Sequence, residues 1–524
     1  MRYYRAMALL TEHITYADAQ RLCSPARLWE LFDGDRERLN IAHECVDRHP
    51  PERPAVRIAH GDGRDELFSF GALAAWSGRF AHFLADRGIG HGDRVGIMLE
   101  PSLPFYAGLF GSVKRGAIAV PLFTLFGPEG FRLRVDDCTP RLLLVSPAQA
   151  AIARDVPGLL TVVADDAFLA ALAKYPDRFE PDTRADDLAV FQYTSGTTRE
   201  LPAAVRHTQR SIVTLMIAAL YGTGVRPGDE FFCPSSPAWG HGLWHGTLGP
   251  LALGVTTGAF AGKFDADRLL RALADYRITN LSAAATHYRM MKSAGTAARY
   301  RYAIRKLSFT GEPIDEATRA FTEATFGAPV CSMYGTTEVG VILASYPGAP
   351  DFRVKPGSLG RPVPGVQVAV QRPDGTECAA AELGELKVWR RDAWFPTKDR
   401  GWADADGYFY HAGRADDVII SAGWTISAVE VEGALLKHAD VREAAVIGVP
   451  DSLRGHVVKA FIVSPRRGDP TFARELQEWT RLRLAQHEYP RQVEFVTELP
   501  KTPAGKVNRK ILREREARAG APAS

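Results

Sequence analysis

The sequence predicts an α/β protein with a large N-terminal domain, a β-rich segment within that domain, and a small α+β C-terminal domain. Apolar runs of strand length alternate with segments of helical periodicity over the first half of the chain, which favours mostly parallel sheets covered by helices. Residues 354–410 are rich in prolines, glycines and short β-like runs, which indicates a small β-rich subdomain. At 524 residues, the chain is also too long for a single hydrophobic core.

The first helices and strands are visible as changes of hydrophobic period. Residues 69–84 are predicted to form a helix, because Leu73, Trp76, Phe80 and Phe83 fall on one stripe. Closely spaced glycines then indicate a turn. The elements predicted next are a helix at residues 105–114 and strands at residues 94–98, 117–120 and 141–145.

The C-terminal domain is predicted to begin at Asp416, which divides the chain into residues 1–415 and 416–524. The β-rich segment ends just before this point, in Tyr408-Phe409-Tyr410. The pattern beyond it predicts a helix at residues 428–438 and strands at residues 446–449 and 459–463.

The composition is that of an ordinary globular protein, with 46% hydrophobic and 24% charged residues. The formal net charge of +3 is too small to indicate a nucleic-acid partner. No run reaches the roughly 18 apolar residues of a membrane span, and residues 7–10 are too short for a signal-peptide core, so we expect a cytoplasmic protein. The cysteines lack metal-like spacing and are expected to be free thiols; they are Cys23, Cys45, Cys138, Cys233, Cys331 and Cys378.

A hydroxyl-rich glycine turn stands between an apolar, strand-like run at residues 188–191 and a segment of helical spacing. The turn reads Tyr193-Thr194-Ser195-Gly196-Thr197-Thr198. Its hydroxyl groups could donate to the oxygens of a polyphosphate, and its glycine would let backbone amides approach the ligand. A turn of this kind is more often an ordinary loop, so the interpretation depends on the motifs that follow it.

Four further motifs follow in a fixed order. They are Gly311-Glu312-Pro313 with Tyr334-Gly335-Thr336-Thr337-Glu338, then Asp399-Arg400-Gly401, then Gly413-Arg414-Ala415-Asp416-Asp417-Val418-Ile419, and finally Pro500-Lys501-Thr502-Pro503-Ala504-Gly505-Lys506. Together with the turn, they resemble the motifs of the acyl-adenylate-forming superfamily of acyl-CoA synthetases, peptide-synthetase adenylation domains and luciferases. The resemblance extends from about residue 68 to residue 510 and is far more specific for the superfamily than for the substrate.

The resemblance implies a large N-terminal domain of two α/β subdomains plus a small β-rich subdomain, and a small mobile α+β lid that turns about a hinge at Asp416. It also implies a ligase that uses ATP, Mg²⁺ and coenzyme A, as a monomer or homodimer. A carboxylate would attack the α-phosphate of ATP to give acyl-AMP, and a thiol would then displace AMP. Catalysis of the first step would consist mostly of positioning and charge stabilisation.

Three residues are implied to act on the reacting groups. Glu338 is the expected Mg²⁺ ligand, because a carboxylate suits a hard cation beside phosphates. Thr337 would donate to the α-phosphate, and the ammonium group of Lys506 would lie between the substrate carboxylate and that phosphate. The alternatives are a surface glutamate for Glu338 and a solvated basic tail for Lys506.

Other residues are implied to bind the nucleotide and coenzyme A. Tyr334 would stack on adenine beside Gly311-Glu312-Pro313, Asp399 would accept from both ribose hydroxyls, and Arg414 would bind ribose or phosphate. Gly423 would let the pantetheine arm pass close to the backbone. Each of these residues also has an ordinary structural explanation. Tyr334 could be a core tyrosine and Asp399 a turn aspartate. Arg414 could form a surface ion pair, and Gly423 could belong to a turn at the end of a strand.

The glycine turn departs from the family pattern after its last threonine. The family usually continues Gly-x-Pro-Lys-Gly, whereas this chain continues Arg199-Glu200-Leu201-Pro202-Ala203-Ala204. The glycine is replaced, one residue is inserted and the lysine position holds Ala203. Arg199, Arg206 or His207 could supply compensating charge, but a catalytically weakened nucleotide-binding relative stays an alternative.

The acid is indicated mainly by Gly335. Acetyl- and propionyl-specific relatives have tryptophan there, so the glycine implies an open acyl pocket, and the motifs look most like those of medium-chain and aromatic-acid CoA ligases. Trp239, His241 and Trp244 are candidates for the acyl side, with core packing equally favoured. The absence of acidic residues between positions 231 and 264 argues against an amino acid. A carrier-protein phosphopantetheine thiol is the alternative acceptor.

Overall fold

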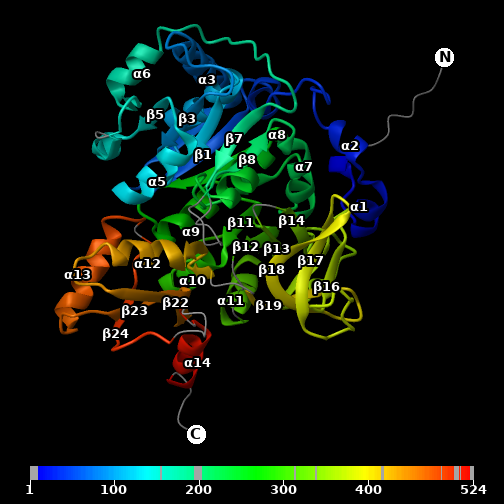
Figure 1. Cartoon of the computed structure of the whole chain (residues 1–524). Coiled ribbons are helices and arrows are strands. Elements are labelled where there is room, and N and C mark those ends of the chain that lie inside the picture. Colours follow the sequence, from blue (N-terminus) through cyan, green and yellow to red (C-terminus); the bar gives the residue numbers. More distant parts are fainter. Residues whose placement is uncertain are drawn as a thin grey trace. The chain divides into compact units, whose positions relative to one another are not determined.

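The computed structural model describes residues 10–153, 156–193, 203–311, 314, 316–336, 339–414, 418–485, 487–500, 507 and 509–519. The chain divides into two compact units, which are described separately (Figure 1). The N-terminal unit comprises Met1–Leu122, Pro140–Gln192 and Val205–Gly413, and the C-terminal unit comprises Phe123–Thr139, Tyr193–Ala204 and Arg414–Ser524. The fold is α/β, as predicted. No helix in the described part of the chain has the length and apolar character of a membrane span.

The first sheet of the N-terminal unit has six strands in the order β6-β5-β3-β4-β7-β8. Its strands are β3 (Arg94–Met98), β4 (Ile118–Pro121), β5 (Leu142–Val145), β6 (Leu160–Val163), β7 (Leu188–Gln192) and β8 (Val205–Thr208). All neighbours are parallel except β7 and β8. Nearly every residue of β3, β4 and β5 is buried, as expected for parallel strands covered on both faces. The continuous apolar runs in the sequence therefore predicted these three strands correctly.

Two long helices accompany this sheet, and both were expected from the sequence, the first of them from its apolar stripe. They are α3 (Phe70–Ala85) and α4 (Leu103–Lys114), which pack against each other. Each begins at a serine whose hydroxyl accepts from a backbone N–H three residues on: Ser69 from Ala72 at 3.1 Å, and Ser102 from Phe105 at 3.4 Å. Short helices near this sheet are η3 (Pro147–Ala153) and α6 (Asp166–Leu172).

The second sheet has thirteen strands in the order β16-β17-β18-β19-β15-β14-β13-β12-β11-β9-β10-β1-β2. The strands are β1 (Pro54–His60), β2 (Asp65–Ser69), β9 (Glu230–Phe232), β10 (Thr256–Ala261), β11 (Asn280–Ala284), β12 (Lys306–Thr310), β13 (Val330–Thr336), β14 (Gly340–Ala344), β15 (Ser358–Pro362), β16 (Val368–Gln371), β17 (Gly384–Arg390), β18 (Ala393–Ala403) and β19 (Phe409–Arg414). From β1 to β13 the neighbours are parallel, whereas β13, β14 and β15 are antiparallel. The predicted β-rich segment is therefore a continuation of the parallel sheet, joined to it at β13 and β14.

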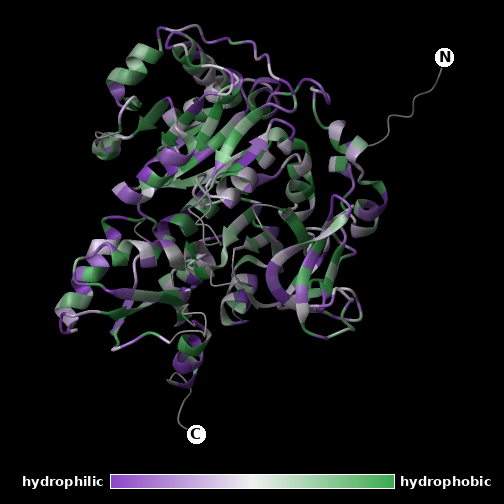
Figure 2. Ribbon diagram, viewed as in Figure 1, coloured by the Kyte–Doolittle hydropathy of each residue, from purple (hydrophilic) through white to green (hydrophobic). Residues whose placement is uncertain are grey.

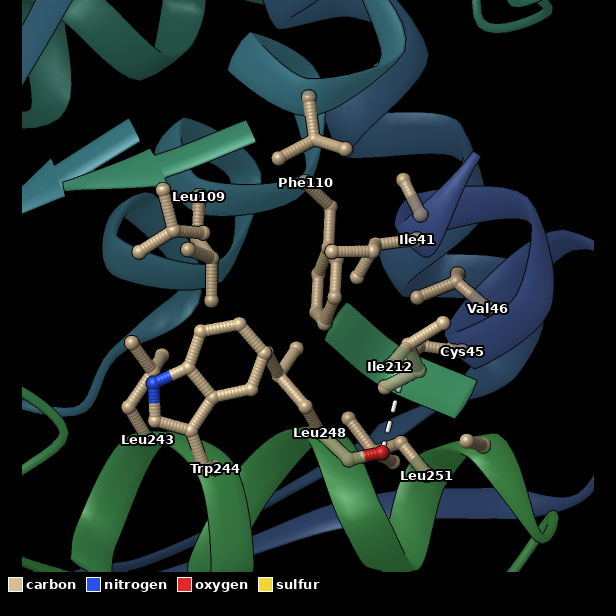
Figure 3. Packing of buried hydrophobic residues seen from close by; sticks show 14 of the residues in the cluster. Ile41, Cys45, Val46, Leu109, Phe110, Ile212, Leu243, Trp244, Leu248 and Leu251 are labelled. Atoms are coloured by element: carbon tan, nitrogen blue, oxygen red, sulfur yellow. Dashed lines mark hydrogen bonds between the residues drawn. The ribbon is translucent and has the colours of Figure 1, made fainter. Parts of the chain in front are cut away.

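Helices enclose this second sheet and fill the core beside it. They are α1 (Tyr16–Leu22), α2 (Pro25–Trp29), α7 (Ser211–Ile217), α8 (Gly249–Ala252), α9 (Ala266–Asp275), α10 (Ala285–Ala294) and α11 (Glu316–Phe326). The π-helices η2 (His43–Asp47), η4 (Ala218–Gly222) and η5 (His241–Leu248) and the 3-10 helices η1 (Leu10–Glu12) and η6 (Ala297–Arg299) complete this set. Hydrophobic residues line the strands, and hydrophilic residues gather on the loops and outer helix faces (Figure 2). In the largest core, Trp244 of η5 packs among Leu109, Phe110 and Leu248 (Figure 3).

The C-terminal unit is a small α+β structure. It contains α5 (Pro128–Cys138), the hairpin β20 (Val418–Ser421) and β21 (Trp424–Ser427), α12 (Ala428–Leu436), β22 (Glu443–Asp451), β23 (Gly455–Val463), α13 (Pro470–Arg481), β24 (Gln492–Phe495) and α14 (Arg509–Ala519). The predicted helix and strands of this region correspond to α12, β22 and β23. The sequence did not indicate that α5 belongs here; Gly127 N–H donates to the Leu484 carbonyl at 2.7 Å, and Gly130 N–H to that of Arg483 at 2.8 Å.

Candidate active site

Several predicted site residues follow the carboxyl ends of the parallel strands in the second sheet. Gly311 comes directly after β12, and Tyr334 and Gly335 lie near the end of β13. The parallel pairing of β12 with β13 reaches Phe309 and Ser332, so Gly311 and Tyr334 each come two residues beyond the same point of the sheet along their own strands. The carboxyl edge of such a sheet is the usual place for a ligand, because every loop that leaves it starts from the same side.

Tyr334 and Asp399 meet directly, although they are 65 residues apart in the sequence. The Tyr334 hydroxyl donates to Asp399 Oδ2 at 2.6 Å. Asp399 is 3% exposed and its Oδ1 lies 3.4 Å from His411 Nε2. A carboxylate has about four acceptor sites, so it can hold the tyrosine and still accept from a diol such as ribose. The pair therefore fits the expected adenosine contacts, with the tyrosine ring oriented by its hydroxyl.

His411 is a site residue that the sequence did not reveal. It lies in β19, and its ring centroid is 6.3 Å from that of Tyr334. The only signal in the sequence is its place in the run Tyr408-Phe409-Tyr410-His411, which reads as an ordinary strand. Its proximity to Asp399 arises from sheet pairing, which local patterns do not specify.

The two ends of the predicted phosphate loop are held by one carboxylate within the C-terminal unit. Asp137 Oδ2 accepts from the Tyr193 hydroxyl at 2.6 Å and from the Ala204 backbone N–H at 3.2 Å. Tyr193 itself is buried, and burial raises the pKa of its phenol. We refer to Asp137, Tyr193 and Ala204 as the loop anchor.

Many predicted functional residues lie outside the described residues, so their roles stay predictions. They are Thr194, Ser195, Gly196, Thr197, Thr198, Glu312, Pro313, Thr337, Glu338, Asp416 and Lys506. Arg414 is described only as the last residue of β19. Within the described residues, no group of three or more histidine, cysteine, aspartate or glutamate side chains could hold a metal ion. The predicted metal site at Glu338 is not tested by that observation.

The candidate acyl-side residues lie at the start of η5. His241 is 3% exposed and both ring nitrogens have partners: Nδ1 is 2.9 Å from Ser235 Oγ, and Nε2 is 2.8 Å from Ser282 Oγ. Burial and these two hydrogen-bond partners are enough to explain His241 as a structural histidine of the core. Trp239 is half-buried, and its ring lies edge-on to that of His241 at 5.4 Å. The substrate-binding roles of both stay predictions.

Trp244 belongs to the core on one side and meets polar groups on the other. Its six-membered ring faces Phe110, whereas its nitrogen lies on the opposite side (Figure 3). The indole N–H donates to Gln192 Oε1 at 2.9 Å, and the His207 ring packs against the indole at 4.5 Å. Gln192 ends β7, directly before Tyr193 and the predicted phosphate loop, and was not identified from the sequence.

Gly335 lies in the tight hairpin of β13 and β14, where a bulge separates it from Tyr334. A Cβ atom at Gly335 would lie 1.9 Å from the Gly340 carbonyl oxygen and 2.8 Å from Val341 Cα. Close backbone approach therefore explains the glycine without an acyl pocket. A tryptophan introduced here would move the hairpin, so its effect on acid preference would not report on the pocket alone.

We expect Gly335→Ala to destabilise the fold by about 1–3 kcal/mol, because the opposing strand must move to admit the methyl group. Gly433→Ala is the matched control, since a Cβ atom there would meet nothing within 4 Å. Chemical unfolding of both variants tests this expectation. Equal stability of the two variants would show that the hairpin accommodates a side chain.

Gly423 also has a local explanation. It follows Ala422 in the two-residue turn between β20 and β21, where φ is +54° at Ala422 and +77° at Gly423. Two successive positive φ angles are typical of a type I′ hairpin turn, in which glycine is strongly favoured. Its role in binding coenzyme A stays a prediction.

Four histidines of the N-terminal unit are held in their neutral form. Burial lowers the pKa of His207, His245 and His287 to about 4, and that of His241 well below its usual value. His287 Nδ1 accepts from the Ala284 backbone N–H at 3.2 Å, at the start of α10. Protonation of this nitrogen would remove the acceptor.

We expect His287→Gln to gain stability relative to the natural protein as the pH falls. The unfolded imidazole takes up a proton near pH 6.5, whereas the folded one stays neutral to about pH 4, so His287 destabilises the fold increasingly between these values. Glutamine does not titrate and can accept from Ala284. The difference in unfolding free energy should change by about 1.4 kcal/mol per pH unit in this window. Urea unfolding at several pH values would measure it, and a constant difference would contradict it.

Comparison with known proteins places the chain in a family. A family model for AMP-binding enzymes matches residues 42–392, and a model for the AMP-binding enzyme C-terminal domain matches residues 430–506. The chain belongs to the AMP-binding enzyme family. The match confirms the resemblance to the acyl-adenylate-forming superfamily that the motifs indicated.

Relatives of this AMP-binding enzyme include two named ligases. The uncharacterized acyl–CoA ligase YtcI of Bacillus subtilis (strain 168) is 31% identical over 499 residues, covering 89% of this chain and 93% of the relative. A 3-hydroxybenzoate–CoA ligase of Aromatoleum sp. (strain CIB) is 29% identical over 522 residues, covering 91% and 97%. The crystal structure of the Brucella canis acyl-CoA synthetase has a TM-score of 0.73 at 32% identity, covering 97% of this chain and 100% of that one.

Proposed function

We propose that this AMP-binding enzyme is an ATP-dependent acid–thiol ligase that converts a medium-chain or aromatic carboxylic acid into its coenzyme A thioester through acyl-AMP. The observation that carries the proposal is the contact of the half-buried Tyr334 with the buried carboxylate of Asp399, near the carboxyl end of β13. An oriented aromatic ring beside a diol-binding carboxylate suits adenosine. The names of the relatives support a carboxylic acid as substrate and coenzyme A as acceptor.

The proposed chemistry has two steps. A carboxylate oxygen forms a bond to the α-phosphorus of ATP, and the bond to the departing pyrophosphate breaks. The thiol sulfur then attacks the acyl carbon, AMP leaves and the thiol proton passes to solvent. Mg²⁺ held by Glu338 would neutralise charge on the phosphate oxygens. Tyr334 and Asp399 would hold adenosine, while Lys506 would stabilise charge as the acid reacts.

ATP–pyrophosphate exchange over a panel of medium-chain and aromatic acids tests this proposal. We expect exchange with at least one acid, followed by thioester formation with free coenzyme A. Faster loading of a phosphopantetheinyl carrier protein than of free coenzyme A would show that the carrier-protein thiol, and not coenzyme A, is the acceptor. ATP binding without exchange for any acid would contradict the proposal and favour a catalytically weakened relative.

A further inference from the structure

The side of Trp244 that faces away from the core carries polar atoms without partners. Because an indole N–H can only donate, the Gln192 atom that it contacts is the amide oxygen. The amide nitrogen, with its two N–H donors, therefore points elsewhere. Gln192 is 2% exposed, and its Nε2 is buried without a hydrogen-bond partner among the described residues.

His207 presents a second such atom on the same face of the sheet. In the β7–β8 register Gln192 is level with Val205 and Val190 with His207, so the Gln192 and His207 side chains lie on one face, two residues apart. The His207 ring packs on Trp244, and its Nε2 is also buried with no partner in the described part of the chain. Two polar side chains thus converge on one indole.

These atoms lie beside the segment predicted to form the acyl side. A Cβ atom at Gly240 would be 3.4 Å from Gln192 Oε1 and 3.6 Å from its Nε2, so the backbone between Trp239 and His241 lies near the Gln192 amide. Other buried atoms without partners occur elsewhere in the protein, many of them arginine Nε atoms. The Gln192 and His207 atoms differ because both side chains contact the same indole, where the end of β7 meets the predicted acyl segment.

A buried donor without a partner costs about 1–3 kcal/mol, which favours a ligand atom or a water molecule at this place. The charge of the surroundings restricts the group. The Gln192 amide is neutral, and burial keeps the His207 imidazole neutral as well. Arg206, the neighbouring cation on β8, belongs to the opposite face and lies over the Phe191 ring at 5.2 Å. A carboxylate or phosphate would therefore find no counter-charge from this strand.

We propose that the acid carries an uncharged hydrogen-bonding group, a hydroxyl or a carbonyl, on its acyl part, and that Gln192 and His207 bind this group beside Trp244. The inference rests on the proposed ligase function and narrows its substrate class. A hydroxyl fits best, because its oxygen accepts from the Gln192 amide while the group also pairs with His207 Nε2. Gln192 and His207 are then specificity-determining residues, and Trp244 orients the Gln192 amide.

The test compares matched acids that differ only in the polar group: hexanoate with 6-hydroxyhexanoate, benzoate with 3-hydroxybenzoate, and pentanoate with 4-oxopentanoate. The readout is the ratio of kcat/KM for the polar acid to that for its parent. We expect the ratio to exceed about tenfold for at least one pair, because binding of the parent acid leaves the buried donors unpaired. Gln192→Met should lower that ratio about tenfold, and His207→Phe, which keeps a ring against Trp244, should lower it too.

Gln209→Met is the matched control. Gln209 is another fully buried glutamine; its Oε1 accepts from the Ile41 N–H at 2.8 Å and its Nε2 also lacks a described partner. A substitution that only disturbs the packing of the core should lower kcat/KM equally for both acids of a pair. Gln209→Met should therefore leave the ratio unchanged. The proposal is overturned if every parent acid reacts as well as its polar partner, or if the Gln192 and Gln209 variants change the ratio equally. Exchange with no acid at all would instead overturn the ligase function itself.

Discussion

Lys506→Ala is expected to slow acyl-AMP formation by roughly 10²–10³ while leaving thioester formation from supplied acyl-AMP nearly unchanged. The family motif assigns this lysine to the first half-reaction, where its ammonium group would stabilise the charge that develops between carboxylate and α-phosphate. Pyrophosphate exchange measures the first step, and the reaction of synthetic acyl-AMP with coenzyme A measures the second.

Lys501→Ala is the control for this prediction, because Lys501 belongs to the same basic segment but not to the catalytic position of the motif. It should change both rates little. Equal losses in the two half-reactions of Lys506→Ala would contradict the idea that the C-terminal domain presents different residues in each step. Equal losses in the two lysine variants would indicate a general electrostatic role for the segment.

Asp399→Ala is expected to lower kcat/KM for ATP by roughly 10²-fold, mostly through a higher KM. The substitution removes the acceptor proposed for both ribose hydroxyls, and it also releases the Tyr334 hydroxyl that Asp399 holds at 2.6 Å. Steady-state kinetics with ATP varied at saturating acid and Mg²⁺ would measure the effect. The melting temperature should be recorded for the same samples, since Asp399 is buried.

Tyr334→Phe separates the two contributions of Asp399. The variant keeps the aromatic ring and the carboxylate but loses the hydrogen bond between them. We expect a loss of about tenfold or less, as for one hydrogen bond. If Tyr334→Phe loses as much as Asp399→Ala, the carboxylate acts mainly by orienting the ring, and the direct ribose contact is wrong.

The sequence predicted those parts of the fold that depend on local patterns. The runs that became β3, β4 and β5 are apolar apart from Arg94, and the stripe of α3 has helical spacing, so each could be recognised within about a dozen residues. The order of strands in a sheet is set by contacts between distant segments. The joining of β13 to β14 within one thirteen-stranded sheet, and the place of α5 in the C-terminal unit, could not be predicted in this way.

The residues of the candidate site show the same difference between local patterns and contacts of distant segments. Tyr334 and Asp399 were recognised because each belongs to a motif, and the structure adds that they touch. His411 and Gln192 belong to no motif and became visible only through their neighbours. Gly335 and Gly423 also belong to motifs, but the surroundings of the first and the backbone of the second each supply a local reason for the residue, so their predicted roles stay predictions.

The loop anchor lets the predicted phosphate loop change in length at little cost in stability. Asp137 ties Tyr193 to Ala204, and the β7–β8 ladder begins beside them at Gln192 and Val205, so the separation of the loop ends is set outside the loop. Lengthening a connection of this size by one residue then adds only about 0.1 kcal/mol of closure entropy. The inserted residue is therefore nearly neutral for folding. Loops of different length from relatives should then be accepted between the same two ends, so exchanging this segment would test its predicted role in ATP binding apart from its effect on stability.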